Sequence, residues 1–399
     1  MTKFGDSSGR SGLSAGGLFQ LIQRWMRGPE SPDFPIPTQI ATTVLVLWLP
    51  LVILSLFENS LVGTGVAQPL FADLVPHVRF LIAVPLLLLA DLVIDPAVTT
   101  ADYDLETSGV VPDAEQPRFQ AAREKLRQAR DSVWPDVVII VLAFGFTWQF
   151  KPGYGDSALE AVATSWMRST QDGSVHFTPA GWWYVLVSGP MFQVILFRWL
   201  WRFLIWGAFL FRVSRLSLAL RPTHPDLAGG LGYVGVAQQA FAIVFLAFAT
   251  VSSSTIAHDI ISEGQKFQDE RLEIATLVVI FVVIIHVPLL FFSRQLFLAR
   301  RAGLEQYGSL AHKLSDAFHQ KWIERDSSSV GADLLASTDP SAMADYTATF
   351  DNVRSMRMIP VTLRGVLILT GILLAPFLPL VLTAYSLQDL FNRLADALV

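Results

Sequence analysis

The sequence predicts an all-α integral membrane protein with about seven transmembrane helices and a cytoplasmic N-terminus. The 399 residues are 52% hydrophobic and only 16% charged, which is a larger apolar share than a soluble domain needs. Seven apolar runs are long enough to cross a bilayer, and Lys and Arg gather in alternate loops between these runs. Together these three observations predict the class.

Composition also removes several classes of function. The net charge of −5 is too small to favour a nucleic-acid partner. The absence of cysteine excludes disulfides, thiolate metal sites and iron–sulfur clusters. The sequence names no cofactor, and it predicts neither a catalytic nor a metal-binding site.

The N-terminal tail, residues 1–38, is predicted to be cytoplasmic and to contain a short helix on the membrane surface. It lacks the charged region, apolar core and cleavage site of a signal peptide, so we expect the first span to direct insertion. The surface helix is predicted from apolar residues that share one helical face: Leu18, Leu21, Ile22, Trp25 and Met26.

The region 39–293 is predicted to hold the first six transmembrane helices. Each apolar run has about the 20 residues that a bilayer core requires. A basic helix, 117–131, lies on the cytoplasmic side between the second and third spans. Including the seventh, the predicted spans are 39–57, 76–94, 133–150, 181–211, 231–257, 272–293 and 360–385.

Residues 294–359 are predicted to form a cytoplasmic helical hairpin. The helical pattern continues from residue 294 beyond the length of any bilayer crossing, with an apolar stripe that includes Leu304, Tyr307 and Leu314. Asp339 is the expected N-cap of the second helix, because Pro340 follows at the first helical position. The region 360–399 then supplies the seventh span and an amphipathic C-terminal helix.

The distribution of positive charge sets the predicted orientation. Most of the 29 Lys and Arg residues fall in the segments that an N-terminus-inside arrangement places in the cytoplasm. The C-terminus then lies outside. We expect a multi-pass protein of a bacterial-type inner (plasma) membrane.

Two arginines fall inside the fourth apolar run. Arg198 and Arg202 are one helical turn apart, and Asp91 and Asp136 lie at a compatible depth in the second and third spans. A charge at that depth requires a partner, a water-filled cavity or a route to the interface. Three interpretations follow: side chains that reach the headgroups, structural ion pairs, or a cavity that attracts an anion.

The turn that follows, 221–232, is the densest local sequence in the chain. Its two prolines end the preceding helix, Asp226 can cap the next one, and Gly229 and Gly230 allow unusual backbone angles. It is interpreted as a self-capped turn or as a site for an anion or lipid headgroup, with catalysis by a His–Asp pair as a third option. The candidate ligand-binding residues here are Arg215, Arg221, His224, Asp226, Gly229 and Gly230.

His286 is a further candidate ligand-binding residue, because it lies within the sixth span, two residues before Pro288. An ionisable residue at membrane depth is a functional-site hypothesis by default. The alternative is a neutral histidine that forms hydrogen bonds inside the helix bundle.

Function is predicted only in outline. A channel or transporter for a small solute is favoured, and the arginines make an anion the expected solute. The alternative is a membrane scaffold or sensor that binds a protein or an anionic lipid through its cytoplasmic face. An enzyme is disfavoured, because no nucleotide loop, metalloprotease helix or nucleophile elbow is present. The expected partners are the lipid bilayer, an anionic lipid or small anion, and a second copy of the chain.

Overall fold

A computed structural model provides the structure of the chain. The predicted surface helix near the N-terminus and the amphipathic helix at the C-terminus lie outside the described residues. The residues that the structure describes are 36–62, 66–148, 165–171, 174–262, 264–324, 334 and 337–384.

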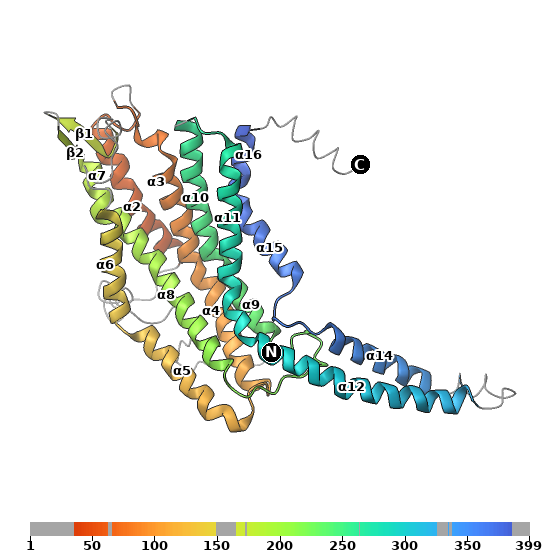
Figure 1. Cartoon of the computed structure of the whole chain (residues 1–399). Coiled ribbons are helices and arrows are strands. Elements are labelled where there is room, and N and C mark those ends of the chain that lie inside the picture. Colours follow the sequence, from red (N-terminus) through yellow and green to blue (C-terminus); the bar gives the residue numbers. More distant parts are fainter. Residues whose placement is uncertain are drawn as a thin grey trace.

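Long apolar helices form an elongated bundle (Figure 1). Six of them are long and apolar enough to cross a membrane. In chain order these are α2 (Ile36–Phe57); α3 (Leu74–Val78), η2 (Arg79–Ala83) and α4 (Val84–Thr107) as one; α7 (Pro179–Trp183), η5 (Tyr184–Ser188) and α8 (Gly189–Val213) as one; α9 (Gly232–Ala240) with α10 (Ala242–Ser262); α11 (Phe267–His286), η6 (Val287–Phe292) and α12 (Ser293–Trp322) as one; and α15 (Leu363–Leu374), η7 (Ala375–Phe377) and α16 (Leu378–Ala384) as one.

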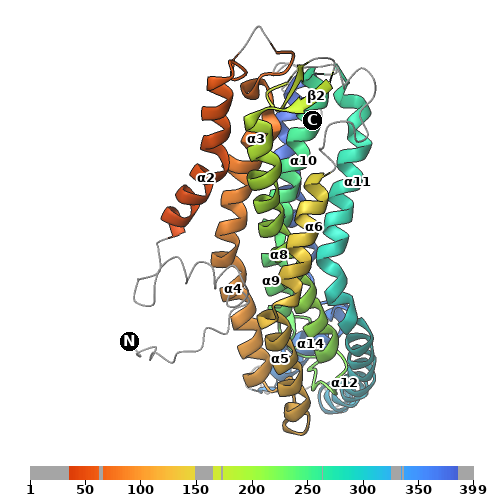
Figure 2. The same cartoon turned by 90° about the vertical axis from the view of Figure 1, so that its left-hand side faces the viewer.

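The predicted third span is a shorter apolar helix, α6 (Trp134–Trp148), of 15 residues. Figure 2 shows it lying along α8, with α5 (Gln116–Asp131) continuing beyond its end.

The six long apolar helices confirm the predicted class of polytopic all-α membrane protein. The number of spans and the side of the membrane on which the N-terminus lies stay predictions.

Two helices extend well past the predicted membrane boundary at one end of the bundle. α4 continues through Pro96 to Thr107, whereas the predicted span ends at residue 94. α5 returns antiparallel to it, and Arg123 joins the two, because its guanidinium lies 2.5 Å from Asp102 and 2.9 Å from Glu106. We refer to this end of the bundle, which carries the basic helix α5, as the basic end.

The opposite end carries a small antiparallel hairpin that the sequence did not predict, β1 (Arg168–Gln171) and β2 (Ser174–Phe177). Thr178 follows β2 and begins α7 by accepting a hydrogen bond from the Gly181 N–H at 2.9 Å. A short β-ribbon therefore leads directly into the continuous helix formed by α7, η5 and α8.

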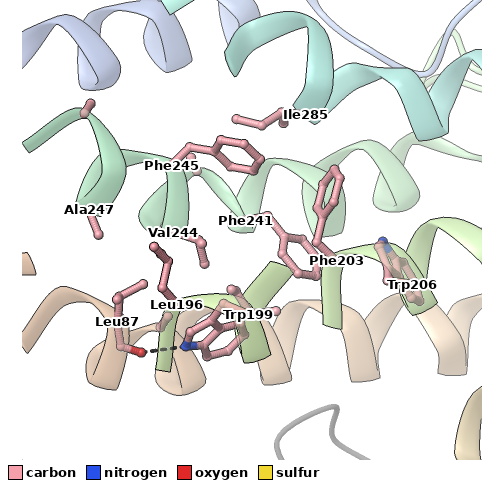
Figure 3. Packing of buried hydrophobic residues seen from close by; sticks show 14 of the residues in the cluster. Leu87, Leu196, Trp199, Phe203, Trp206, Phe241, Val244, Phe245, Ala247 and Ile285 are labelled. Carbon is pink, nitrogen blue, oxygen red and sulfur yellow. Dashed lines mark hydrogen bonds between the residues drawn. The ribbon is translucent and has the colours of Figure 1, made fainter. Parts of the chain in front are cut away.

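Aromatic side chains from α8 and α10 form much of the buried core (Figure 3). Phe203 packs edge-on against Phe241 and Phe245, with ring centroids 5.4 and 5.6 Å apart. The Trp199 indole N–H donates to the Leu87 carbonyl at 2.8 Å, so a buried polar group of α8 is satisfied by α4.

The helical hairpin, α12 and α14 (Asp339–Ser355), runs sideways from the basic end (Figure 1). Tyr346 of α14 donates its hydroxyl proton to the Tyr307 carbonyl of α12. The expectation for Asp339 is wrong in detail: Thr338 occupies the N-cap position, and the Asp339 carboxylate accepts hydrogen bonds from Lys321 and Trp322. Asp339 therefore closes the far end of the hairpin instead of capping its own helix.

Candidate functional site

The connection between α8 and α9, residues 214–231, includes most of the turn that the sequence singled out, 221–232, and we call this connection the junction turn. The Asp226 carboxylate organises it. One oxygen accepts hydrogen bonds from the N–H groups of Ala228 at 2.8 Å and Gly230 at 3.2 Å, and the other accepts from the Gly232 N–H at 2.8 Å. Asp226 thus caps the first turn of α9 from within the chain.

The backbone of the junction turn adopts left-handed angles at three positions. Gly229 has φ +67° and Gly230 has φ +96°, values that a residue with a Cβ rarely adopts. Leu227 has φ +55°, which is unusual for a non-glycine residue. The surrounding contacts hold this strained residue in place.

Asp226 already occupies the position in which an anion was expected. Burial disfavours the ionised carboxyl, but three backbone N–H bonds and the His224 side chain outweigh that penalty and lower the pKa of Asp226 below its ordinary value. The positive end of α9 therefore has an internal counter-charge. This geometry favours the interpretation as a self-capped turn over an external anion.

The remaining candidate residues of the junction turn serve local roles. His224 Nδ1 lies 2.8 Å from Asp226 Oδ1. The exposed Arg215 guanidinium lies over the Phe211 ring, 4.7 Å from its centroid. Arg221 is exposed, and its backbone N–H donates to the Gly229 carbonyl at 3.1 Å. The structure does not bring the side chains of His224, Arg215 and Arg221 together at one point.

The junction turn holds several distant segments together, which the sequence did not predict. The Gln295 side chain of α12 donates to the carbonyls of Ser214 and Leu216, both at 2.7 Å. The Arg357 N–H, just after α14, donates to the Leu227 carbonyl at 2.7 Å, and the Ala219 N–H donates to the Val110 carbonyl at 2.8 Å. One turn therefore joins α8 and α12 to the segments that directly follow α4 and α14.

Close packing reinforces this junction. Gly303 of α12 is buried directly against Pro222: a Cβ built on Gly303 would lie 2.7 Å from the Pro222 Cβ and 3.0 Å from a methyl group of Val353 in α14. Only glycine lets α12, α14 and the junction turn meet at this point.

The two intramembrane arginines face carboxylates on neighbouring helices. Arg202 Nη1 lies 2.7 Å from Asp91 Oδ1 of α4. Arg198 Nε lies 3.9 Å from Asp136 Oδ1 of α6. Of the three interpretations, this arrangement favours structural ion pairing between α4, α6 and α8.

His286 ends α11, where the helix changes to the 3₁₀ turn η6. Its Nδ1–H donates to the Val282 carbonyl at 2.7 Å, and its Nε2 is buried without a hydrogen-bond partner.

Sequence reasoning missed a buried glutamine beside this break. Gln238 donates to the Ile285 carbonyl at 2.6 Å and accepts from the Trp206 indole N–H at 3.1 Å. It satisfies a carbonyl at the point where α11 gives way to η6. A polar residue inside the apolar run of α9 was the available signal.

Comparison with known proteins finds no matching family model, no curated relative and no similar solved structure. Function is therefore inferred from the geometry of this chain alone.

Proposed function

We propose that the protein is a membrane-anchored scaffold that presents the hairpin of α12 and α14 to a protein partner. One observation carries the proposal: the hairpin extends sideways from the bundle, and the junction turn fixes its base through hydrogen bonds to Gln295 and Arg357. A helix pair anchored at one end and exposed along its length is suited to docking.

The charge and exposure of the hairpin indicate the kind of partner. α14 carries Asp339, Asp345 and Asp351 against the single base Arg354, whereas the bases of α12 outnumber its two acids, Glu305 and Asp316, so the hairpin as a whole is close to neutral. On α12, Leu310 is 51% exposed, and Ala317, two turns further along the same face, is also exposed. The exposed apolar side chains on this face of α12 are the feature that favours a soluble protein as the partner.

The channel or transporter that the sequence favoured has weaker geometric support. Its arginines lie beside carboxylates, as described above. Two grooves in the described part of the chain, of about 490 and 570 Å³, are lined mainly by apolar side chains of α2 and α4 and of α11. Such grooves are typical of surfaces that face lipid. Transport stays a prediction.

The proposal requires the basic end to face the cytoplasm. Because the chain contains no cysteine, Lys125→Cys on α5 and Ser174→Cys on β2 each create a single labelling site. We expect a membrane-impermeant maleimide to label Ser174→Cys in intact cells and Lys125→Cys only after the membrane is opened. The reverse pattern would place the hairpin on the outer side and contradict the proposal.

Docking is tested in native membranes with a photo-crosslinking amino acid at Leu310. We expect one adduct with a discrete protein, and we expect Ala317→Arg on the same face to abolish it. The same crosslinker at Val279, an exposed apolar position on α11, serves as the matched control and should capture lipid only. A Leu310 adduct that persists in Ala317→Arg, or no protein adduct at all, counts against the scaffold.

A further inference from the structure

Arg79 is a third arginine inside the membrane-spanning part of the chain, and it lies near the end opposite the junction turn. It is the sixth residue of the helix that begins at Leu74, about 8 Å along the axis from that helix end. A cation at this depth is stabilised only by a partner, by water or by lipid headgroups.

The Arg79 side chain points into the bundle. Its guanidinium donates a hydrogen bond to the Tyr184 hydroxyl and lies over the Phe192 ring, 5.3 Å from the centroid. Tyr184 and Phe192 are only 5% and 6% exposed. The cation therefore lies among buried aromatic rings of η5 and α8, which attract it through their faces.

No carboxylate balances this charge among the residues that the structure describes. Arg198 and Arg202 each have an Asp oxygen within 4 Å, whereas Arg79 has none. The carboxylate of Asp73, at the start of α3, instead accepts from the Val75 N–H at 3.1 Å and the Trp166 indole at 3.0 Å. Arg79 Nε is buried and has no hydrogen-bond partner.

The local backbone is also unusual on both sides of this contact. Arg79 is the first residue of η2 and Tyr184 is the first residue of η5, and both segments are π-helical. The rings of Phe80 and Tyr184, 6.1 Å apart, join the two segments. Single π-helical turns occur frequently at functional sites, because they redirect side chains within a helix.

We propose that Arg79 binds one oxyanion at this end of the bundle. One Nη is engaged by Tyr184, which leaves Nε and the other Nη as the side-on edge that pairs with two oxygens of a phosphate or carboxylate. Because Nε is buried, neighbouring side chains must move to admit the oxyanion. The oxyanion comes either from the phosphate of a phospholipid in that leaflet or from a solute. This site is separate from the proposed scaffold, and neither depends on the other.

The test uses the purified full-length chain and two arms that distinguish the sources. Delipidated protein in neutral detergent is titrated with inorganic phosphate while its melting temperature is recorded, and native mass spectrometry counts phospholipids retained from membranes. Arg79→Gln removes the charge. Arg79→Lys keeps the charge but lacks the two-point edge, and it carries the test if the Gln variant fails to fold. Arg127→Gln, an exposed arginine of α5, is the matched control.

We expect one of two results in the unchanged protein and in Arg127→Gln. A saturable rise in melting temperature identifies a solute oxyanion, and a retained phospholipid identifies a headgroup. In either case Arg79→Gln abolishes binding of the oxyanion, and Arg79→Lys weakens its apparent affinity roughly tenfold or more. If neither phosphate stabilisation nor lipid retention differs between the unchanged protein and the Arg79→Lys variant, the site does not exist.

Discussion

Replacing Asp226 with Ala is expected to lower the melting temperature of the protein in detergent by roughly 5 °C or more. The substitution leaves the N–H groups of Ala228, Gly230 and Gly232 without the carboxylate that now accepts all three. Unpaired donors in a partly buried turn cost about 2–4 kcal/mol together, in line with the loss of a strong helix cap and its neighbouring bonds.

Two further variants calibrate this result. Asp226→Asn keeps one acceptor oxygen, so its effect should be intermediate. Asp345→Ala removes an exposed carboxylate of α14 that makes no such bonds, and it should be close to neutral. Equal melting temperatures for Asp226→Ala and Asp345→Ala would show that the cap does not hold the junction turn.

The loss of stability caused by replacing Asp226 should depend on pH. Because the pKa of Asp226 is lower in the folded protein than in the unfolded chain, its contribution is fully present above the unfolded value. The contribution is lost as the pH falls through the folded value. The difference between the unchanged protein and Asp226→Asn should therefore be full at pH 7 and should shrink below about pH 4. A constant difference from pH 7 to pH 3 would mean that the charge of Asp226 is irrelevant.

Gly303→Ala and Gly308→Ala are expected to have opposite effects although both lie in α12. At Gly303 the added Cβ would lie 2.7 Å from the Pro222 ring, so overpacking should destabilise the protein by about 1–3 kcal/mol. At Gly308 the nearest atom, on Phe350, is 3.9 Å away, so the better helix propensity of Ala should stabilise α12 by about 0.5–1 kcal/mol.

Thermal unfolding of the two variants measures this contrast directly. Since the residue change is identical, differences in the unfolded chain cancel to a first approximation. Gly303→Ala should melt below the unchanged protein and Gly308→Ala at or above it. Equal shifts in the same direction would mean that α12 does not pack tightly on the junction turn.

Local patterns were sufficient to predict the helices and the interior of the junction turn. Apolar run length located the apolar helices of the bundle, although not the continuation of α4 to Thr107, and the spacing of Asp226 before two glycines predicted the self-capped turn. The positions of Asp91 and Asp136 along their helices predicted that they lie at the depth of Arg202 and Arg198. The structure contains both contacts, Arg202 with Asp91 and Arg198 with Asp136.

Contacts between distant segments could not be predicted in this way. The bonds from Gln295 to two carbonyls and the packing of Gly303 on Pro222 depend on how helices far apart in sequence meet. Arg79 was visible as a charge inside an apolar run, but the direction of its side chain depends on a π-helical turn that no periodicity indicates. Tertiary packing decides all three.

The most direct measurement is the distance between the hairpin and the bundle in a lipid membrane. Spin labels on Leu310→Cys of α12 and Lys125→Cys of α5 report it by pulsed electron paramagnetic resonance, because the chain has no other cysteine. If the junction turn fixes the hairpin, the distance distribution is single and narrow, stays narrow with Gly308→Ala and broadens with Gly303→Ala. A broad distribution in the protein that carries only the two labels would contradict a hairpin held in place for docking.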